Sequence, residues 1–140
     1  MEFIRVNKSN IYKLQEFIDN AGNALQTFRY FNNRSLLVVE NHSVTYLIVD
    51  KNKAPVCYGH LEKENEILWL GIAVIEKQKG KGLGKKMMQY LIDFAKQSNE
   101  TIITLSVDKI NTTAISFYKK FGFSVIKETE NIIYMKKEGL

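Results

Sequence analysis

A glycine-rich basic segment, KQKGKGLGKK at residues 77–86, constrains the fold of this chain more than any other stretch. It follows an apolar run at residues 67–74 and leads into a helical pattern. An apolar run, alternate glycines and a helical pattern together predict a strand, a tight loop and a helix. Because glycine has no Cβ, Gly80, Gly82 and Gly84 let the main chain turn sharply and let a ligand approach it closely.

The loop and the start of its helix favour an anion-binding site. The first amides of a helix have no partner within the helix, and the helix dipole places partial positive charge at the same end. Five lysines surround the loop: Lys77, Lys79, Lys81, Lys85 and Lys86. We interpret the segment as a cradle for a diphosphate; a flexible basic surface loop is the alternative that the glycines alone leave open.

Neither of two common nucleotide-binding motifs accounts for the loop. A Walker loop requires serine or threonine after its glycine and lysine, whereas Lys86 follows Gly84 and Lys85 here. A Rossmann fingerprint requires a different glycine spacing near the start of a βαβ unit, with an acidic residue about 20 residues further on. The phosphates are therefore expected to bind in a different fold.

Composition predicts a single domain over residues 1–140. A chain of 140 residues with 45% hydrophobic content is long enough for one core and too short for two comfortable domains. Much of the positive charge, which is +5 net, gathers in one loop, and this suits a small polyanion better than a nucleic-acid track. We therefore expect no nucleic-acid partner.

The sequence gives no indication of secretion, membrane insertion or metal binding. The N-terminal segment carries charges before any apolar core, and no apolar stretch approaches the ~20 residues that cross a membrane. Cys57 has no cysteine partner, so nothing indicates an oxidising compartment. Cys57 and the two histidines lie in no metal-ligand spacing. We expect a cytoplasmic protein with no metal and no membrane partner.

Periodicity predicts a mixture of helices and strands. Strands are expected at residues 1–6, 43–50, 55–62, 67–74, 102–107, 123–128 and 131–136, and helices near residues 11–18, 83–97 and 111–121. The strands at 43–50, 55–62 and 67–74 are expected to form an antiparallel meander. The continuous apolar run at 67–74 predicts burial on both faces. If this strand neighbours the strand at 102–107, the two must run parallel with a right-handed crossover.

The last two predicted helices carry apolar stripes at helical spacing. The first stripe consists of Leu83, Met87, Tyr90, Leu91 and Phe94. The second helix, which Asn111 is expected to cap, carries Ala114, Phe117, Tyr118 and Phe121. Both stripes are expected to pack against the sheet.

Two motifs in this order resemble the GCN5-related N-acetyltransferase (GNAT) family. They are IAVIEKQKGKGLGKKMM at residues 72–88 and NTTAISFYKKFGF at residues 111–123, and the resemblance spans roughly Leu61 to Lys136. It implies an α/β (α+β) fold with a mixed, mostly antiparallel sheet of six to seven strands, a splayed parallel pair and about four flanking helices. Lys79 stands where the family's phosphate motif has arginine or glutamine, a mild departure because backbone amides supply most phosphate contacts.

The resemblance also implies that acetyl-CoA is the acyl donor and that particular residues bind it or assist the reaction. The main chain of Ile72, Ala73 and Val74 would pair with the pantetheine arm, and an amide there would stabilise the oxyanion. Asn111 and Phe117 would lie near the thioester. The pyrophosphate would bind the loop formed by Lys79, Gly80, Lys81, Gly82, Leu83, Gly84 and Lys85. Tyr118 matches the tyrosine that protonates the departing thiolate; the alternative is a purely structural core aromatic.

An attacking amine needs a proton acceptor, because alkylamines with a pKa near ~10.4 are protonated at neutral pH. Glu66, at the entry of the strand at 67–74, resembles a position from which some family members present a glutamate. His60, on the preceding strand, has polar neighbours in the sequence that would place its pKa in a useful range. Ordered water is a third route, and His42 is expected to be an exposed residue near a helix end or turn.

The aromatic cluster at residues 28–31 admits two interpretations. It packs a short helix onto the sheet, or Arg29 and Tyr30 line an acceptor pocket in which the guanidinium meets a carboxylate or phosphate. Arg29 with its aromatic neighbours, and the segment GHLEKE at residues 59–64, resemble family members that acetylate amino sugars carried on nucleotides, and such an acceptor would explain an arginine and aromatic rings together. A polyamine or aminoglycoside would require an acidic pocket, and the 15 acidic residues form no run.

The resemblance therefore implies an enzyme that acetylates a primary amine of a small molecule. Acetylation of a protein N-terminus or lysine, and a CoA-binding module without catalysis, stay open as alternatives. The sequence leaves both a monomer and a homodimer open.

Overall fold

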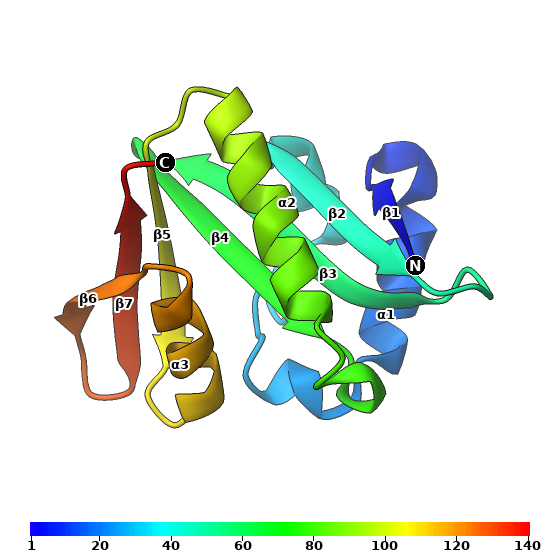
Figure 1. Ribbon diagram of the computed structural model, residues 1–140. Helices are drawn as coiled ribbons and strands as arrows, with labels where there is room; N and C mark the ends of the chain where they lie inside the picture. Colours follow the sequence, from blue (N-terminus) through cyan, green and yellow to red (C-terminus); the bar gives the residue numbers. More distant parts are fainter.

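A seven-stranded mixed sheet forms the frame of the protein in a computed structural model that describes residues 1–140 (Figure 1). The strands are β1 (Glu2–Arg5), β2 (Val44–Val49), β3 (Pro55–Glu64), β4 (Ile67–Val74), β5 (Ile102–Asp108), β6 (Ser124–Glu128) and β7 (Ile132–Glu138). Their order is β1-β2-β3-β4-β5-β7-β6. All neighbouring pairs are antiparallel except β4 and β5, which are parallel, as the sequence predicted.

Three α-helices and four short 3₁₀ segments connect the strands. The α-helices are α1 (Ile11–Asn20), α2 (Leu83–Gln97) and α3 (Thr112–Lys120). The 3₁₀ segments are η1 (Lys8–Asn10), η2 (Gly22–Gln26), η3 (Leu36–Asn41) and η4 (Glu76–Gln78). None of these helices is both long enough and apolar enough to cross a membrane.

Local chemistry fixes where α3 begins and ends. The Asn111 side chain accepts a hydrogen bond from the backbone N–H of Ala114 at 3.2 Å, which satisfies one of the free amides of the first turn. Gly122 follows the helix with a φ of 90°, a conformation that glycine adopts without a Cβ clash. Both features agree with the predicted bounds.

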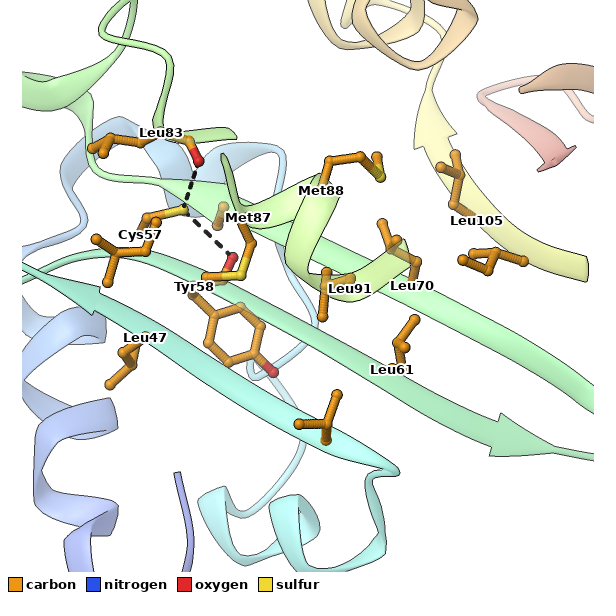
Figure 2. Close-up of a cluster of buried hydrophobic side chains, with 14 of the residues drawn as sticks. Leu47, Cys57, Tyr58, Leu61, Leu70, Leu83, Met87, Met88, Leu91 and Leu105 are labelled. Carbon is orange, nitrogen blue, oxygen red and sulfur yellow. Dashed lines mark hydrogen bonds between the residues drawn. The ribbon is translucent and has the colours of Figure 1, made fainter. Parts of the chain in front are cut away.

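Helices α1 and α2 cover opposite faces of the sheet, and β3 shows how. Successive side chains of a strand point to opposite faces. Tyr58 of β3 packs near Phe17 of α1, with ring centroids 6.0 Å apart, whereas Gly59 faces Met87 of α2. In Figure 2, Met87 and Leu91 lie against β3 within the buried cluster. The core therefore has two layers, and β3 is buried on both sides as far as Leu61.

Strands β4 and β5 diverge from one another. A single residue pair, Trp69 with Thr104, is in parallel register. By contrast, β3 and β4 stay paired over eight positions, from Glu64 with Ile67 to Cys57 with Val74. Toward the carboxyl ends of β4 and β5 a wedge therefore opens between the two strands (Figure 1).

One prediction about burial is wrong. The run at residues 67–74 is not buried on both faces: Ile67 is 40% exposed, and Trp69, Ile72 and Val74 are only half-buried. Ile67 and Trp69 point to the face opposite α2, whereas Ile72 and Val74 lie where β5 has diverged and line a cavity. Tyr90 of α2 is 44% exposed but packs on the sheet as expected, with its ring centroid 3.5 Å from that of Phe3.

We predict that Gly59→Ala destabilises the protein. A Cβ at Gly59 would lie 2.5 Å from both Cγ and Sδ of Met87. Overpacking of this kind costs roughly 1–3 kcal/mol, measurable as a lower free energy of unfolding in urea. The matched control is Gly84→Ala, where the new Cβ would meet Phe117 at 3.6 Å, an ordinary contact, within a helix. Equal stabilities of the two variants would contradict this account of the β3–α2 contact.

Candidate functional site

Two adjoining cavities lie beside the open end of β4, the smaller between β4 and β5 and the larger between β4, the glycine loop, α2 and α3. The larger has a volume of about 900 Å³ and the smaller about 410 Å³. Both are lined by Thr27, Phe28, Ile72, Asn111 and Tyr118. These five residues therefore mark the junction at which a ligand in one cavity meets a ligand in the other.

Free backbone amides form one wall of the larger cavity. No amide from Gly80 to Lys85 donates a hydrogen bond within the protein. Lys86 makes the first backbone bond of α2, donating to the carbonyl oxygen of Gly82 at 3.2 Å. Gly82 has a φ of 79°, and a Cβ there would meet no atom within 4 Å. Open space, unpaired donors and the positive end of a 15-residue helix suit an anionic ligand.

All but one of the predicted cofactor residues line the larger cavity. They are Ile72, Ala73, Val74, Lys79, Gly80, Gly82, Leu83, Gly84, Lys85, Asn111 and Phe117. Lys81 is exposed and lies outside both cavities. Gln78 and Lys120, which the sequence analysis did not select, also line it.

Tyr118 lies at the junction of the two cavities. It is 9% exposed on α3, and its ring packs against Phe117 and Phe123 with centroids 5.6 and 5.9 Å away. No protein group hydrogen bonds to its hydroxyl. Burial raises the pKa of Tyr118 to about 12, so the hydroxyl keeps its proton at neutral pH. The side chain thus presents a proton donor at the point where the cavities meet.

Strand alternation builds the smaller cavity. Tyr58, His60 and Glu62 of β3 point to the same face of the sheet, two residues apart. Register extends this face to β4, where His60 lies opposite Gly71 and Glu62 opposite Trp69. Ser106 and Asp108 of β5 complete the lining across the wedge.

A hydrogen-bonded cluster stands at one end of the smaller cavity. Nδ1 of His42 bonds to the Thr45 hydroxyl at 2.7 Å, and Nε2 of the same ring to the Tyr30 hydroxyl at 2.7 Å. The Tyr30 hydroxyl also donates to Glu62 Oε1 at 2.8 Å. His42 stacks on His60 with ring centroids 4.4 Å apart. The expectation that His42 is exposed is therefore wrong: contacts from η3, β2 and the preceding loop enclose it.

His60 is neutral, and its lowered pKa makes it a weak proton acceptor. Its side chain is 3% exposed, and Nδ1 bonds to the Tyr58 hydroxyl at 2.5 Å. Burial, with His42 and Arg34 as smaller causes, lowers the pKa of His60 well below its ordinary value. The predicted useful range is wrong, because desolvation of the charged ring outweighs its polar neighbours.

The loop at residues 27–35 closes over the smaller cavity. The Arg29 guanidinium contacts both carboxylate oxygens of Asp108, at 2.6 and 2.8 Å. Tyr30 lies beneath the Arg34 guanidinium, which is 4.2 Å from the ring centroid. The aromatic cluster does not form a helix here; Phe28 instead packs on Tyr58, with ring centroids 5.2 Å apart. Arg29 and Tyr30 line the cavity, and Arg29 is already paired with a carboxylate of the protein.

Glu66 is the one predicted catalytic residue that lies away from the site. It belongs to the two-residue turn between β3 and β4, has a φ of 67° and is exposed. It lines neither cavity. The structure brings Tyr118 and His60 to the site and leaves Glu66 at the surface.

Sequence reasoning missed two carboxylates of the smaller cavity, Glu62 and Asp108. Glu62 was detectable in principle, because it falls two residues after His60 on a strand and so shares its face. Asp108 follows the apolar part of β5, and its position depends on the pairing with Arg29, 79 residues away. No local pattern signals such a contact.

Comparison with known proteins identifies the family of this chain. A model of the acetyltransferase (GNAT) family matches residues 9–123. The uncharacterised N-acetyltransferase YobR of Bacillus subtilis is 40% identical over 57 residues, which are 41% of this chain and 23% of that protein. A 5-NmdU N-acetyltransferase of Pseudomonas phage PaMx11 is 32% identical over 84 residues, 60% of this chain and 51% of that protein.

The fold is shared with solved structures across nearly its whole length. The crystal structure of PaiA N-acetyltransferase from Thermoplasma acidophilum in complex with coenzyme A superposes with a TM-score of 0.78. The two chains are 16% identical, and the match covers 99% of each. Since the family match includes the glycine loop, α2 and α3, this chain belongs to the GNAT family of acetyltransferases.

Proposed function

We propose that this protein transfers an acetyl group from acetyl-CoA to a primary amine of a small molecule. One observation carries the proposal: a cavity with free amides and lysines adjoins a cavity lined by carboxylates and aromatic rings, and Tyr118 stands between them. A donor and an acceptor that occupied the two cavities would meet at this residue. Holding two reactants together in this way is a large part of catalysis.

The residues of the larger cavity fit the chemical groups of CoA. The free amides at residues 80–85 and the side chains of Lys79 and Lys85 would hold the diphosphate. The edge of β4 at residues 72–74, which β5 leaves open, would pair with the amide groups of the pantetheine arm. CoA supplies an activated thioester, and a β4 amide would donate a hydrogen bond to its carbonyl oxygen.

Two side chains would carry out the proton transfers of the reaction. Tyr118 would donate its proton to the departing thiolate, since its raised pKa keeps it protonated. Among the groups of the smaller cavity, Glu62 would receive the proton of the acceptor's ammonium group, directly or through water. His60 lines the same cavity but accepts a proton poorly, and Glu66 lies too far from the site.

The charged residues of the smaller cavity indicate which chemical groups the acceptor carries. The sequence shows no run of acidic residues, yet Glu62, Glu64 and Asp108 gather here from two strands. Carboxylates favour an acceptor with an ammonium group, and Arg34 supplies a cation for an anionic part. A nucleotide-linked amino sugar carries both kinds of group, and we propose it as the first acceptor to examine.

The proposed function is tested by an acceptor screen. The protein is incubated with acetyl-CoA and a panel of amines. Release of the free CoA thiol is measured, and mass spectrometry identifies the acetylated product. The panel contains nucleotide-linked amino sugars, simple amino sugars, polyamines and peptides with free N-termini or lysines. Turnover of a small-molecule amine supports the proposal. Turnover of peptides alone, or tight CoA binding without turnover of any amine, contradicts it.

We predict that Tyr118→Phe slows the chemical step and leaves acetyl-CoA binding nearly intact. The variant keeps the packing ring and removes only the hydroxyl at the junction. Loss of an acid catalyst lowers kcat by roughly 10²-fold or more, as measured in single-turnover experiments. The dissociation constant for CoA, measured by calorimetry, should change less than about twofold. A variant with unchanged kcat would show that Tyr118 only packs.

We predict that Gly82→Val weakens CoA binding. Valine at a φ of 79° is strained, and its side chain would enter the space before the free amides. We expect an affinity loss of about tenfold, or ~1.4 kcal/mol. Gly139→Val is the matched control, because its φ of 70° imposes the same kind of strain outside both cavities. Equal CoA affinity for the two variants would mean that the diphosphate binds elsewhere.

A further inference from the structure

The cluster around Tyr30 holds three side chains that are metal ligands in many proteins. Donor atoms of His42, His60 and Glu62 all lie within 4.8 Å of one another. His42 follows η3, and the other two residues come from β3, so elements distant in the sequence build the group. We propose that these three side chains bind one divalent transition-metal ion at the end of the smaller cavity.

In each of the two imidazoles, Nδ1 already makes a hydrogen bond to a neighbouring hydroxyl group. Nδ1 of His42 bonds to Thr45 Oγ1, and Nδ1 of His60 bonds to the Tyr58 hydroxyl. A partner of this kind fixes ring orientation and directs the opposite nitrogen toward a metal. Nε2 of His60 makes no hydrogen bond within the protein, and because no enclosed side-chain nitrogen or oxygen lacks a partner, this atom is open to the cavity. It is therefore the imidazole nitrogen that is available to a ligand.

The Tyr30 hydroxyl marks the place of the ion. It lies 2.7 Å from His42 Nε2 and 2.8 Å from Glu62 Oε1, so one oxygen atom bridges two of the proposed ligands. A tetrahedral ion with ligands at ~2.0–2.1 Å needs donor atoms about 3.4 Å apart. The ligands must therefore close modestly, and Tyr30 must withdraw. Its position in a loop without regular secondary structure allows that movement.

The donor set selects the class of ion. Two imidazole nitrogens and one carboxylate suit Zn²⁺ and its transition-metal neighbours, whereas Mg²⁺ and Ca²⁺ prefer oxygen ligands alone. Three protein ligands leave a fourth position, which here would face the cavity. The positive charge of Arg34 disfavours a metal ion at this site. The negative charges of Glu62 and Glu64 compensate for the charge of Arg34.

Metal binding has a consequence for catalysis, and this consequence alone rests on the proposed function. An ion bound to Glu62 would remove the carboxylate that we assign to the acceptor's ammonium group. The ion would then compete with the acceptor and leave CoA binding unchanged. Metal affinity itself does not depend on the reaction, so the two proposals can fail separately.

The test uses the full-length, untagged, metal-free protein with Zn²⁺ in calorimetry and Co²⁺ in visible absorption. We expect one ion per chain and the intense absorption of four-coordinate Co²⁺. His42→Gln, His60→Gln and Glu62→Gln should each lose at least about tenfold in affinity. Tyr30→Phe removes the competing hydroxyl and should bind at least as tightly as the unmodified protein. Glu66→Gln, at the surface outside both cavities, should bind as the unmodified protein does.

Several results would overturn the proposal. They are no binding of Zn²⁺ or Co²⁺ by the unmodified protein, equal affinity in the three ligand variants, and weaker binding in Tyr30→Phe. Circular dichroism and urea unfolding establish that each variant is folded. If one ligand variant does not fold, the other two and the Co²⁺ spectrum still decide the question.

Discussion

The divergence of β4 from β5 is the constraint on which the rest of the structure depends. Only Trp69 and Thr104 are in register, and beyond them the parallel pair opens toward its carboxyl ends. This opening leaves the edge of β4 that faces β5 unpaired at residues 72–74, although the other edge pairs with β3, and it makes room beside β4 for both cavities. It also leaves Ile72 and Val74, near the end of this apolar strand, only half-buried. The same geometry therefore lowers the burial at the end of β4 and creates the site.

Close packing on either side of the wedge fixes the polar groups within it. A Cβ at Gly71 would lie 2.6 Å from Cε1 of His60, so glycine at this position lets the imidazole lie flat against β4. Hydroxyls bond to both ring nitrogens of His42 and to Nδ1 of His60, and no fully enclosed polar side-chain atom lacks a hydrogen bond. Two contacts from the loop, Arg29 to Asp108 and Tyr30 to Glu62, tie the cover of the smaller cavity to β5 and β3. Any acceptor that uses Glu62 or Asp108 must compete with these contacts.

Much of this fold can be predicted from the sequence because its signals are local. Runs of β-branched, aromatic and apolar residues bounded by turns identified β2 to β5, and helical spacing identified α2 and α3, whose limits depend on Gly82, Asn111 and Gly122. The larger cavity follows one continuous strand, loop and helix, so its lining was largely predicted. The smaller cavity gathers Glu62 and Asp108 from separate strands, and His42 joins the cluster beside it from the segment after η3. Spacing along the chain does not report such contacts, which is why His42 was expected at the surface and the carboxylates were missed.

The central claim is that the free amides after β4 hold a diphosphate whose thioester end reaches Tyr118. A crystal structure of the full-length protein with CoA tests it most directly. The account predicts diphosphate oxygens within hydrogen-bonding distance of the amides at residues 80–85, the pantetheine arm along β4, and the sulfur atom beside the Tyr118 hydroxyl. A diphosphate bound at any other part of the surface would contradict it.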